Sequence, residues 1–152
     1  MNRLCSLAVV ALVASLAGCA SIPGAAEGPS VTGSLTLAGP TFGELVLAPT
    51  ACASGEHQVF LGADFGGTDH EIVTRLAVDP LTGPGVRLFD AQAPFVRTLL
   101  MRRADCSSFH LSLERTGWQI NEIYVLRVTL ELDCSLPSGD SIKGSLAAAS
   151  CW

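Results

Sequence analysis

The stretch that decides the fold is Tyr124–Asp133, YVLRVTLELD in one-letter code. Apolar residues stand at every second position of this stretch, and arginine, threonine, glutamate and aspartate fill most of the positions between them. Side chains alternate between the two faces of a β-strand, so this pattern is typical of a strand with one buried and one solvated face. We therefore predict a half-buried strand over these residues.

The same alternation extends outward from this strand. Phe109, Leu111 and Leu113 repeat it, and a weaker series includes Ile72, Leu76 and Val78. Glycine and proline divide the chain at short intervals that leave no room for long helices. These turn signals are Ala38-Gly39-Pro40, Gly66-Gly67-Thr68-Asp69, Thr82-Gly83-Pro84-Gly85 and Pro137-Ser138-Gly139-Asp140. We predict an all-β fold, an antiparallel sandwich or small barrel of about eight strands, stapled by disulfides. Residues 94–103 fit either a strand, which we favour, or a short helix that begins near Pro94.

Composition restricts the class of protein. The chain has 152 residues, of which 49% are hydrophobic and 15% charged, and its formal net charge is −5. High apolar content argues against disorder, and the excess of acidic residues argues against a nucleic-acid partner. The length suits one globular domain.

The N-terminus has the layout of a signal peptide. Arg3 supplies a positive charge, an apolar run extends from Leu4 to Leu16, and Leu16-Ala17-Gly18-Cys19 follows. These four residues resemble the lipobox of bacterial lipoproteins. The resemblance implies cleavage before Cys19, acylation of its thiol, and, because Ala20 follows, export to the outer membrane of a diderm host. Cleavage near Ala17 or Ala20 with Cys19 unmodified is the alternative.

Three segments follow from this interpretation. Residues 1–18 form a lipoprotein signal peptide, residues 19–30 an acylated tether, and residues 31–152 a single β domain. The tether is rich in small and turn-prone residues, and its reach is about 20 Å.

Four cysteines remain after Cys19 is acylated, and an even number in an exported domain predicts two disulfides. A three-residue loop with Gly139 in the left-handed conformation pairs Leu130 with Leu146. Cys151 then lies beside Val125, far from Cys134. Matching the apolar faces of the preceding hairpin pairs Phe109 with Leu132 and Leu113 with Val128, which places Cys106 beside Ser135, one bulge away from Cys134. We therefore predict Cys106–Cys134 and Cys52–Cys151.

Motifs that specify a reaction are missing from the sequence. His70-Glu71 begins like a zinc-protease motif, but Thr74 stands where the second histidine belongs. Asp64, Asp69 and Glu71 match no calcium loop, and we interpret their segment as a solvated turn. We assign no catalytic or metal role to the three histidines, His57, His70 and His110, and predict no cofactor. The arginines of the second half could form a patch for an anionic surface or partner; they are Arg97, Arg102, Arg103, Arg115 and Arg127.

These observations favour a non-enzymatic lipoprotein of the cell envelope. The acyl chains would bind the membrane, and the β domain would bind a protein or another envelope component, or would pack against its neighbours in a purely structural role. Trp152, the last residue, is interpreted as core or interface packing. The alternative is a hydrolase of envelope polymers whose dispersed carboxylates, Asp64, Asp69 and Glu114, are brought together by the fold.

Overall fold

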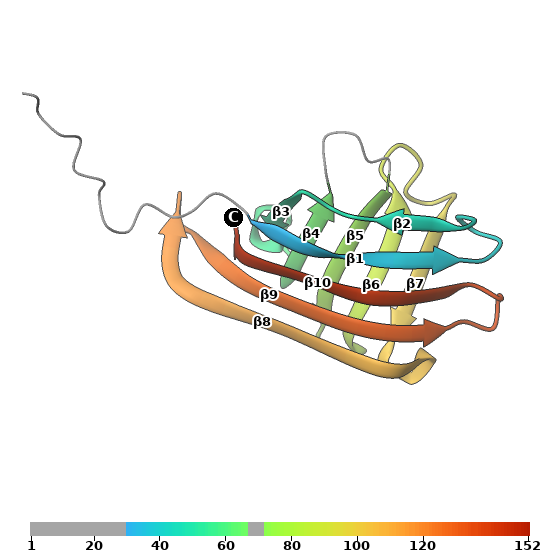
Figure 1. The fold of residues 1–152 in the computed structure, drawn as a ribbon. Coiled ribbons are helices and arrows are strands. Elements are labelled where there is room, and N and C mark those ends of the chain that lie inside the picture. Colours follow the sequence, from blue (N-terminus) through green and yellow to red (C-terminus); the bar gives the residue numbers. More distant parts are fainter. Residues whose placement is uncertain (1–29, 67–71) are drawn as a thin grey trace, which may run out of the picture.

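The computed structural model describes residues 30–66 and 72–152, which form two five-stranded antiparallel sheets packed face to face (Figure 1). Sheet A has the order β2-β1-β10-β9-β8, and sheet B the order β3-β4-β5-β6-β7. The strands of sheet A are β1 (Val31–Ala38), β2 (Leu45–Leu47), β8 (Cys106–Ile120), β9 (Ile123–Ser135) and β10 (Ser141–Cys151). Those of sheet B are β3 (Ala51–Ser54), β4 (Gly62–Gly66), β5 (Ile72–Asp79), β6 (Gly83–Asp90) and β7 (Thr98–Arg102).

The prediction of an antiparallel all-β fold is confirmed, and the architecture is a sandwich rather than a barrel because the two sheets stay separate. The described residues contain ten strands instead of about eight. The additional strands include β2 and β3, which have three and four residues and are too short to show alternation in the sequence. Two short 3-10 helices, η1 (Gly55–Gln58) and η2 (Arg103–Asp105), complete the described elements.

The core lies between the sheets and is supplied by the alternating apolar positions. On β9, the residues from Leu126 to Leu132 at every second position are at most 2% exposed. They pack in one cluster with Leu76, Val86, Leu88 and Met101 of sheet B. Burying one such side chain contributes about 1.5–3 kcal/mol, so this alternation is the main source of stability.

The two long hairpins have the register expected from their apolar faces. Leu130 lies opposite Leu146, Phe109 opposite Leu132 and Leu113 opposite Val128. The β9–β10 loop is closed by the backbone N–H of Leu136, which donates to the Asp140 carbonyl at 2.8 Å. Gly139 has a φ of 90°, the left-handed conformation that the loop requires.

Both predicted disulfides are present, Cys106–Cys134 within sheet A and Cys52–Cys151 between the sheets. A bulge near the start of β8 places Cys106 opposite Cys134. The position of Cys151 differs from the prediction: it lies opposite Leu126, not Val125, because a second bulge follows Ala148. The extra residue turns the Cys151 side chain into the core, where it is fully buried and reaches β3.

Two local predictions need comment. The helical alternative for residues 94–103 is wrong, because Thr98–Arg102 is strand β7 and pairs with β6. The turn expected at Thr82–Gly85 is displaced: residues 80–82 form the turn, and Gly83 already begins β6. The Asp79 carboxylate closes this turn by accepting hydrogen bonds from the backbone of Leu81 and Thr82, both at 2.8 Å. Of the turn predicted at residues 66–69, all but Gly66 lie outside the described residues.

Asp140 connects two loops that are far apart in the sequence. Its carboxylate accepts hydrogen bonds from the N–H and the hydroxyl of Thr41, both at 2.9 Å, and from the Ser138 hydroxyl at 2.7 Å. Desolvation of the buried carboxylate raises its pKa, but these hydrogen bonds outweigh desolvation, and the net pKa of Asp140 is lowered. The ionised form therefore fixes the β1–β2 loop against the β9–β10 turn.

We predict that Asp140→Asn lowers the free energy of unfolding at neutral pH by about 1–3 kcal/mol, because the hydrogen bonds lose a charged acceptor. The folded-state pKa is below the unfolded value of about 3.9, so this contribution is present above that pH and is lost as the pH falls through the folded-state pKa. Denaturant titrations from pH 7 to pH 2.5 should show the difference between the two proteins narrowing at acidic pH.

The matched control is Asp133→Asn, which removes an exposed ion pair with Lys143. It should change stability by less than about 1 kcal/mol. An Asp140→Asn variant no less stable than this control at pH 7 would contradict the role assigned to Asp140.

Candidate functional site

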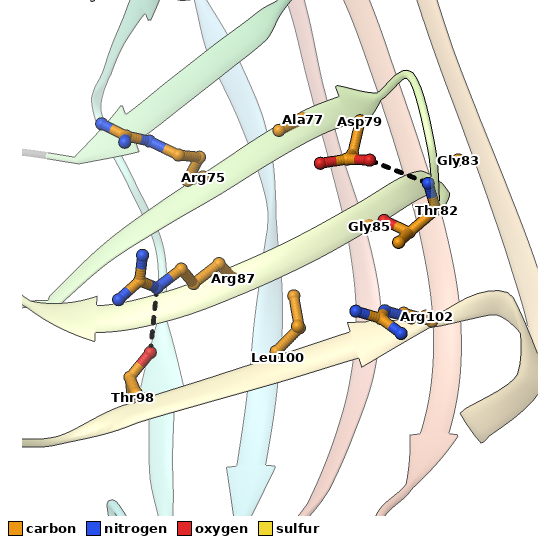
Figure 2. A pocket seen from close by; sticks show the side chains of 10 residues that line it. All are labelled: Arg75, Ala77, Asp79, Thr82, Gly83, Gly85, Arg87, Thr98, Leu100 and Arg102. Atoms are coloured by element: carbon orange, nitrogen blue, oxygen red, sulfur yellow. Dashed lines mark hydrogen bonds between the residues drawn. The ribbon is translucent and has the colours of Figure 1, made fainter. Parts of the chain in front are cut away.

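Three arginines lie on neighbouring strands of sheet B and project from its outer face (Figure 2). They are Arg75 on β5, Arg87 on β6 and Arg102 on β7, and the alternation places them outward because Leu76, Leu88 and Met101 beside them are buried. Arg75 lies directly opposite Arg87 in the ladder, and Arg102 lies opposite Gly85. Like charges directly opposite each other destabilise a sheet, so this arrangement has a cost in stability.

Small residues make the surface concave between these arginines. The floor contains Ala77, Gly83 and Gly85, with the half-exposed Leu100 beside them. A Cβ at Gly85 would lie 3.3 Å from the Met101 carbonyl and would raise the floor. The result is an open trough of about 440 Å³, which we call the arginine trough.

Arg75 is held in place at one side of the arginine trough. Its Nε and Nη2 donate to the two oxygens of Asp64 at 2.8 and 2.7 Å, and Nη2 also donates to Gln58. The guanidinium lies 4.4 Å from the centre of the Phe60 ring. The hydrogen bond with Asp64 raises the pKa of Arg75. The charge of Arg75 is therefore fixed in position and mostly balanced by Asp64.

Arg87 and Arg102 are balanced less completely. Arg87 donates to the Thr98 hydroxyl and to the Pro94 carbonyl, both at 3.1 Å and both neutral acceptors. Neither Arg87 nor Arg102 forms an ion pair with a carboxylate of the described residues. Asp79 is the carboxylate that lines the trough, and its pKa is lowered by hydrogen bonds from the backbone N–H groups of Thr82 and Leu81 and, to a lesser degree, by the positive charge of Arg102.

The trough is therefore positively charged at neutral pH. With Asp64 counted, two carboxylates oppose three guanidinium groups. Guanidinium groups present donors in a planar fork that matches the oxygens of phosphate and carboxylate. The arrangement offers guanidinium donors from Arg87 on β6 and from Arg102 on β7 to an anion over this pair of strands.

The five arginines singled out in the sequence do not form one patch. Arg97 reaches Asp90 at 3.9 Å, Arg115 reaches Glu56 at 2.7 Å and Arg127 reaches Glu114 at 3.6 Å. Arg103 belongs to η2, and Arg102 alone among the five lines the trough. Sequence reasoning missed Arg75 and Arg87; pairing β5 with β6 across the turn at residues 80–82 would have placed them together.

The carboxylates of the hydrolase alternative are not brought together. Asp64 lies on β4 of sheet B beside Arg75, and Glu114 lies on β8 of sheet A beside Arg127. Asp69 and Glu71 lie outside the described residues, as do His70 and Cys19. His57 and His110 are exposed on η1 and β8.

The described part of the chain holds no group of three or more His, Cys, Asp or Glu placed to bind a metal ion. Within the same ranges, no helix has the length and hydrophobicity needed to cross a bilayer.

Comparison of the chain with protein-family models, with curated protein sequences and with solved structures finds no match in any of the three.

We predict that Asp64→Asn lowers the free energy of unfolding by about 1–3 kcal/mol, because it replaces a charged, bidentate partner of the half-buried Arg75. The control is Glu114→Gln, whose ion pair with Arg127 is more than half exposed on both sides and should contribute less than about 1 kcal/mol. Denaturant unfolding of the two variants measures the difference. Equal losses would show that the Asp64–Arg75 pair is no better than a surface ion pair.

Proposed function

We propose that this protein is a lipid-anchored protein of the cell envelope that presents a non-enzymatic binding domain. The arginine trough is its binding face, and its ligand is an anion with phosphate or carboxylate groups. The trough is the observation that carries the proposal, because Arg87 and Arg102 project from adjacent strands beside a floor of small residues and form no ion pair with a carboxylate of the described residues.

The anchor is supported by the sequence. Leu16-Ala17-Gly18-Cys19 resembles a lipobox, and Ala20 after the cysteine favours the outer membrane. The disulfides Cys52–Cys151 and Cys106–Cys134 fit the same proposal, because disulfides persist in oxidising compartments outside the cytoplasm. Two or three acyl chains on Cys19 would hold the protein on a bilayer stably.

Tripolyphosphate is a suitable probe for the arginine trough because it places several oxyanion groups in a row. We predict that the purified protein binds it and that the double variant Arg87→Gln/Arg102→Gln binds it at least about tenfold more weakly, since one charge-assisted hydrogen bond contributes about 1.5–3 kcal/mol. Isothermal titration calorimetry at low salt measures both, and affinity should fall as salt is added.

The control variant Arg127→Gln/Lys143→Gln removes the same charge from the outer face of sheet A. It should keep most of the affinity. Equal weakening by both double variants would mean that the anion responds to the overall charge of the protein, and the trough would then not be a binding site.

The anchor has its own test. We predict that protein extracted from membranes with detergent has the mass of Cys19–Trp152 plus acyl groups, and that the other four thiols are alkylated only after reduction. Cys19→Ala should abolish acylation and release the protein from the membrane. A free Cys19 thiol in the wild-type protein would refute the anchor and leave the prediction for tripolyphosphate intact.

A further inference from the structure

Both tryptophans of the chain lie exposed at one end of the sandwich. Cys151, Leu126 and Arg115 lie opposite one another across β10, β9 and β8. Trp152 follows Cys151 directly, and Trp118 belongs to a bulge of β8 between Arg115 and Gln119. Their exposures are 41% and 59%, large for aromatic side chains of this size. Val125 precedes the buried Leu126 on β9, so the alternation points its side chain away from the core. It is nevertheless only 2% exposed, so this end of the sandwich is packed rather than frayed.

Val59 adds a third apolar side chain at this end. It caps η1, and the Glu56 carboxylate of η1 accepts hydrogen bonds from the Tyr124 N–H at 3.0 Å and from Arg115 at 2.7 Å. Val59 is 94% exposed and has a φ of 62°. A β-branched residue in the left-handed conformation destabilises the fold by about 1–3 kcal/mol. Because the Val59 side chain is exposed, no burial of apolar surface offsets this strain. We call Val59, Trp118 and Trp152 the end patch.

The end patch lies near the start of β1, where the described part of the chain begins. β1 begins at Val31, which lies opposite Ala148, three residues before Cys151. Figure 1 shows the start of β1, the C-terminus and η1 at the same end. Residue 19 is twelve positions before Val31 in the sequence. A flexible chain of this length has a root-mean-square end-to-end distance of about 20 Å, so an anchor at Cys19 keeps this end near the bilayer.

We propose that the end patch rests in the interfacial layer of the bilayer to which the protein is anchored; this inference rests on the lipid anchor proposed above. Tryptophan favours the boundary between headgroups and acyl chains, where its ring is apolar and its N–H finds a partner. A short tether gives the patch a high effective concentration at the bilayer, so weak contacts of three side chains are enough. The arginine trough opens on a broad face of sheet B and is not covered by this contact.

The chain contains two tryptophans, so its tryptophan fluorescence reports on the end patch alone. The acylated protein is reconstituted into vesicles of phosphatidylethanolamine and phosphatidylglycerol, with and without brominated acyl chains. We expect bromine to quench the emission, and the variants Trp118→Phe and Trp152→Phe, each with one tryptophan left, both to be quenched. Unquenched emission from protein that floats with the vesicles would overturn the docking and leave the anchor standing.

Val59→Asn tests the patch further, because asparagine tolerates the left-handed conformation better than valine. We expect this variant to be at least as stable in solution and less quenched in vesicles. Leu81→Asn is the control, since Leu81 is also 94% exposed but lies in the β5–β6 turn, and its quenching should equal that of the wild type.

Two other results would also overturn the docking. A blue shift that depends on protein concentration in detergent, without quenching in vesicles, would assign the patch to a second copy of the chain. If Cys19 is not acylated and the wild type does not float with the vesicles, both the anchor and the docking are refuted. The Cys19→Ala variant should not float, whether or not the end patch contacts the bilayer.

Discussion

The disulfide between Cys52 and Cys151 ties together the two sheets that the apolar core holds face to face. It closes a loop across 99 residues of sequence, so it restricts the unfolded chain more than Cys106–Cys134, which spans 28 residues. Its formation depends on the bulge after Ala148, because the regular alternation of β10 would aim Cys151 at solvent. One inserted residue thus connects the end of the chain to β3 and leaves Trp152 as the exposed residue beyond the bridge.

The parts of the fold that sequence reasoning recovered are those in which apolar faces and turn chemistry agree. Two pairs show this: Leu130 lies opposite Leu146, and Phe109 lies opposite Leu132. A shift of the register by one residue would turn a whole apolar face toward solvent. The bulge that shifts Cys151 leaves no comparable mark, because one extra residue changes the pairing without changing the composition. The bulge at Cys106 was inferred only from the need to bring Cys106 to Cys134. The short strands β2 and β3 were missed for a related reason, since three or four residues hold too little of a period-two pattern.

The candidate site was harder to foresee than the fold. The sequence shows Arg102 within an arginine-rich half of the chain. Other arginines of that half, such as Arg97 and Arg127, form ion pairs with carboxylates. Arg75 and Arg87 are twelve residues apart and come together only through the register of β5 and β6. The arginine trough and the end patch lie on different parts of the sandwich, so the anion and the bilayer that we propose as their ligands do not compete for the same surface.

Strand β8 is the free edge of sheet A, and at fifteen residues it is the longest strand described. A long edge strand presents unpaired backbone N–H and C=O groups, with which the edge strand of another molecule can pair. The ladder of β8 is broken near both ends, between Cys106 and Ser108 and between Arg115 and Gln119, and Glu114, Arg115 and His110 are exposed along it. The regular stretch between these two interruptions, Ser108–Arg115, has eight residues and ends in the charged pair Glu114 and Arg115. An edge interrupted in this way is less able to pair with the same edge of another copy of the chain.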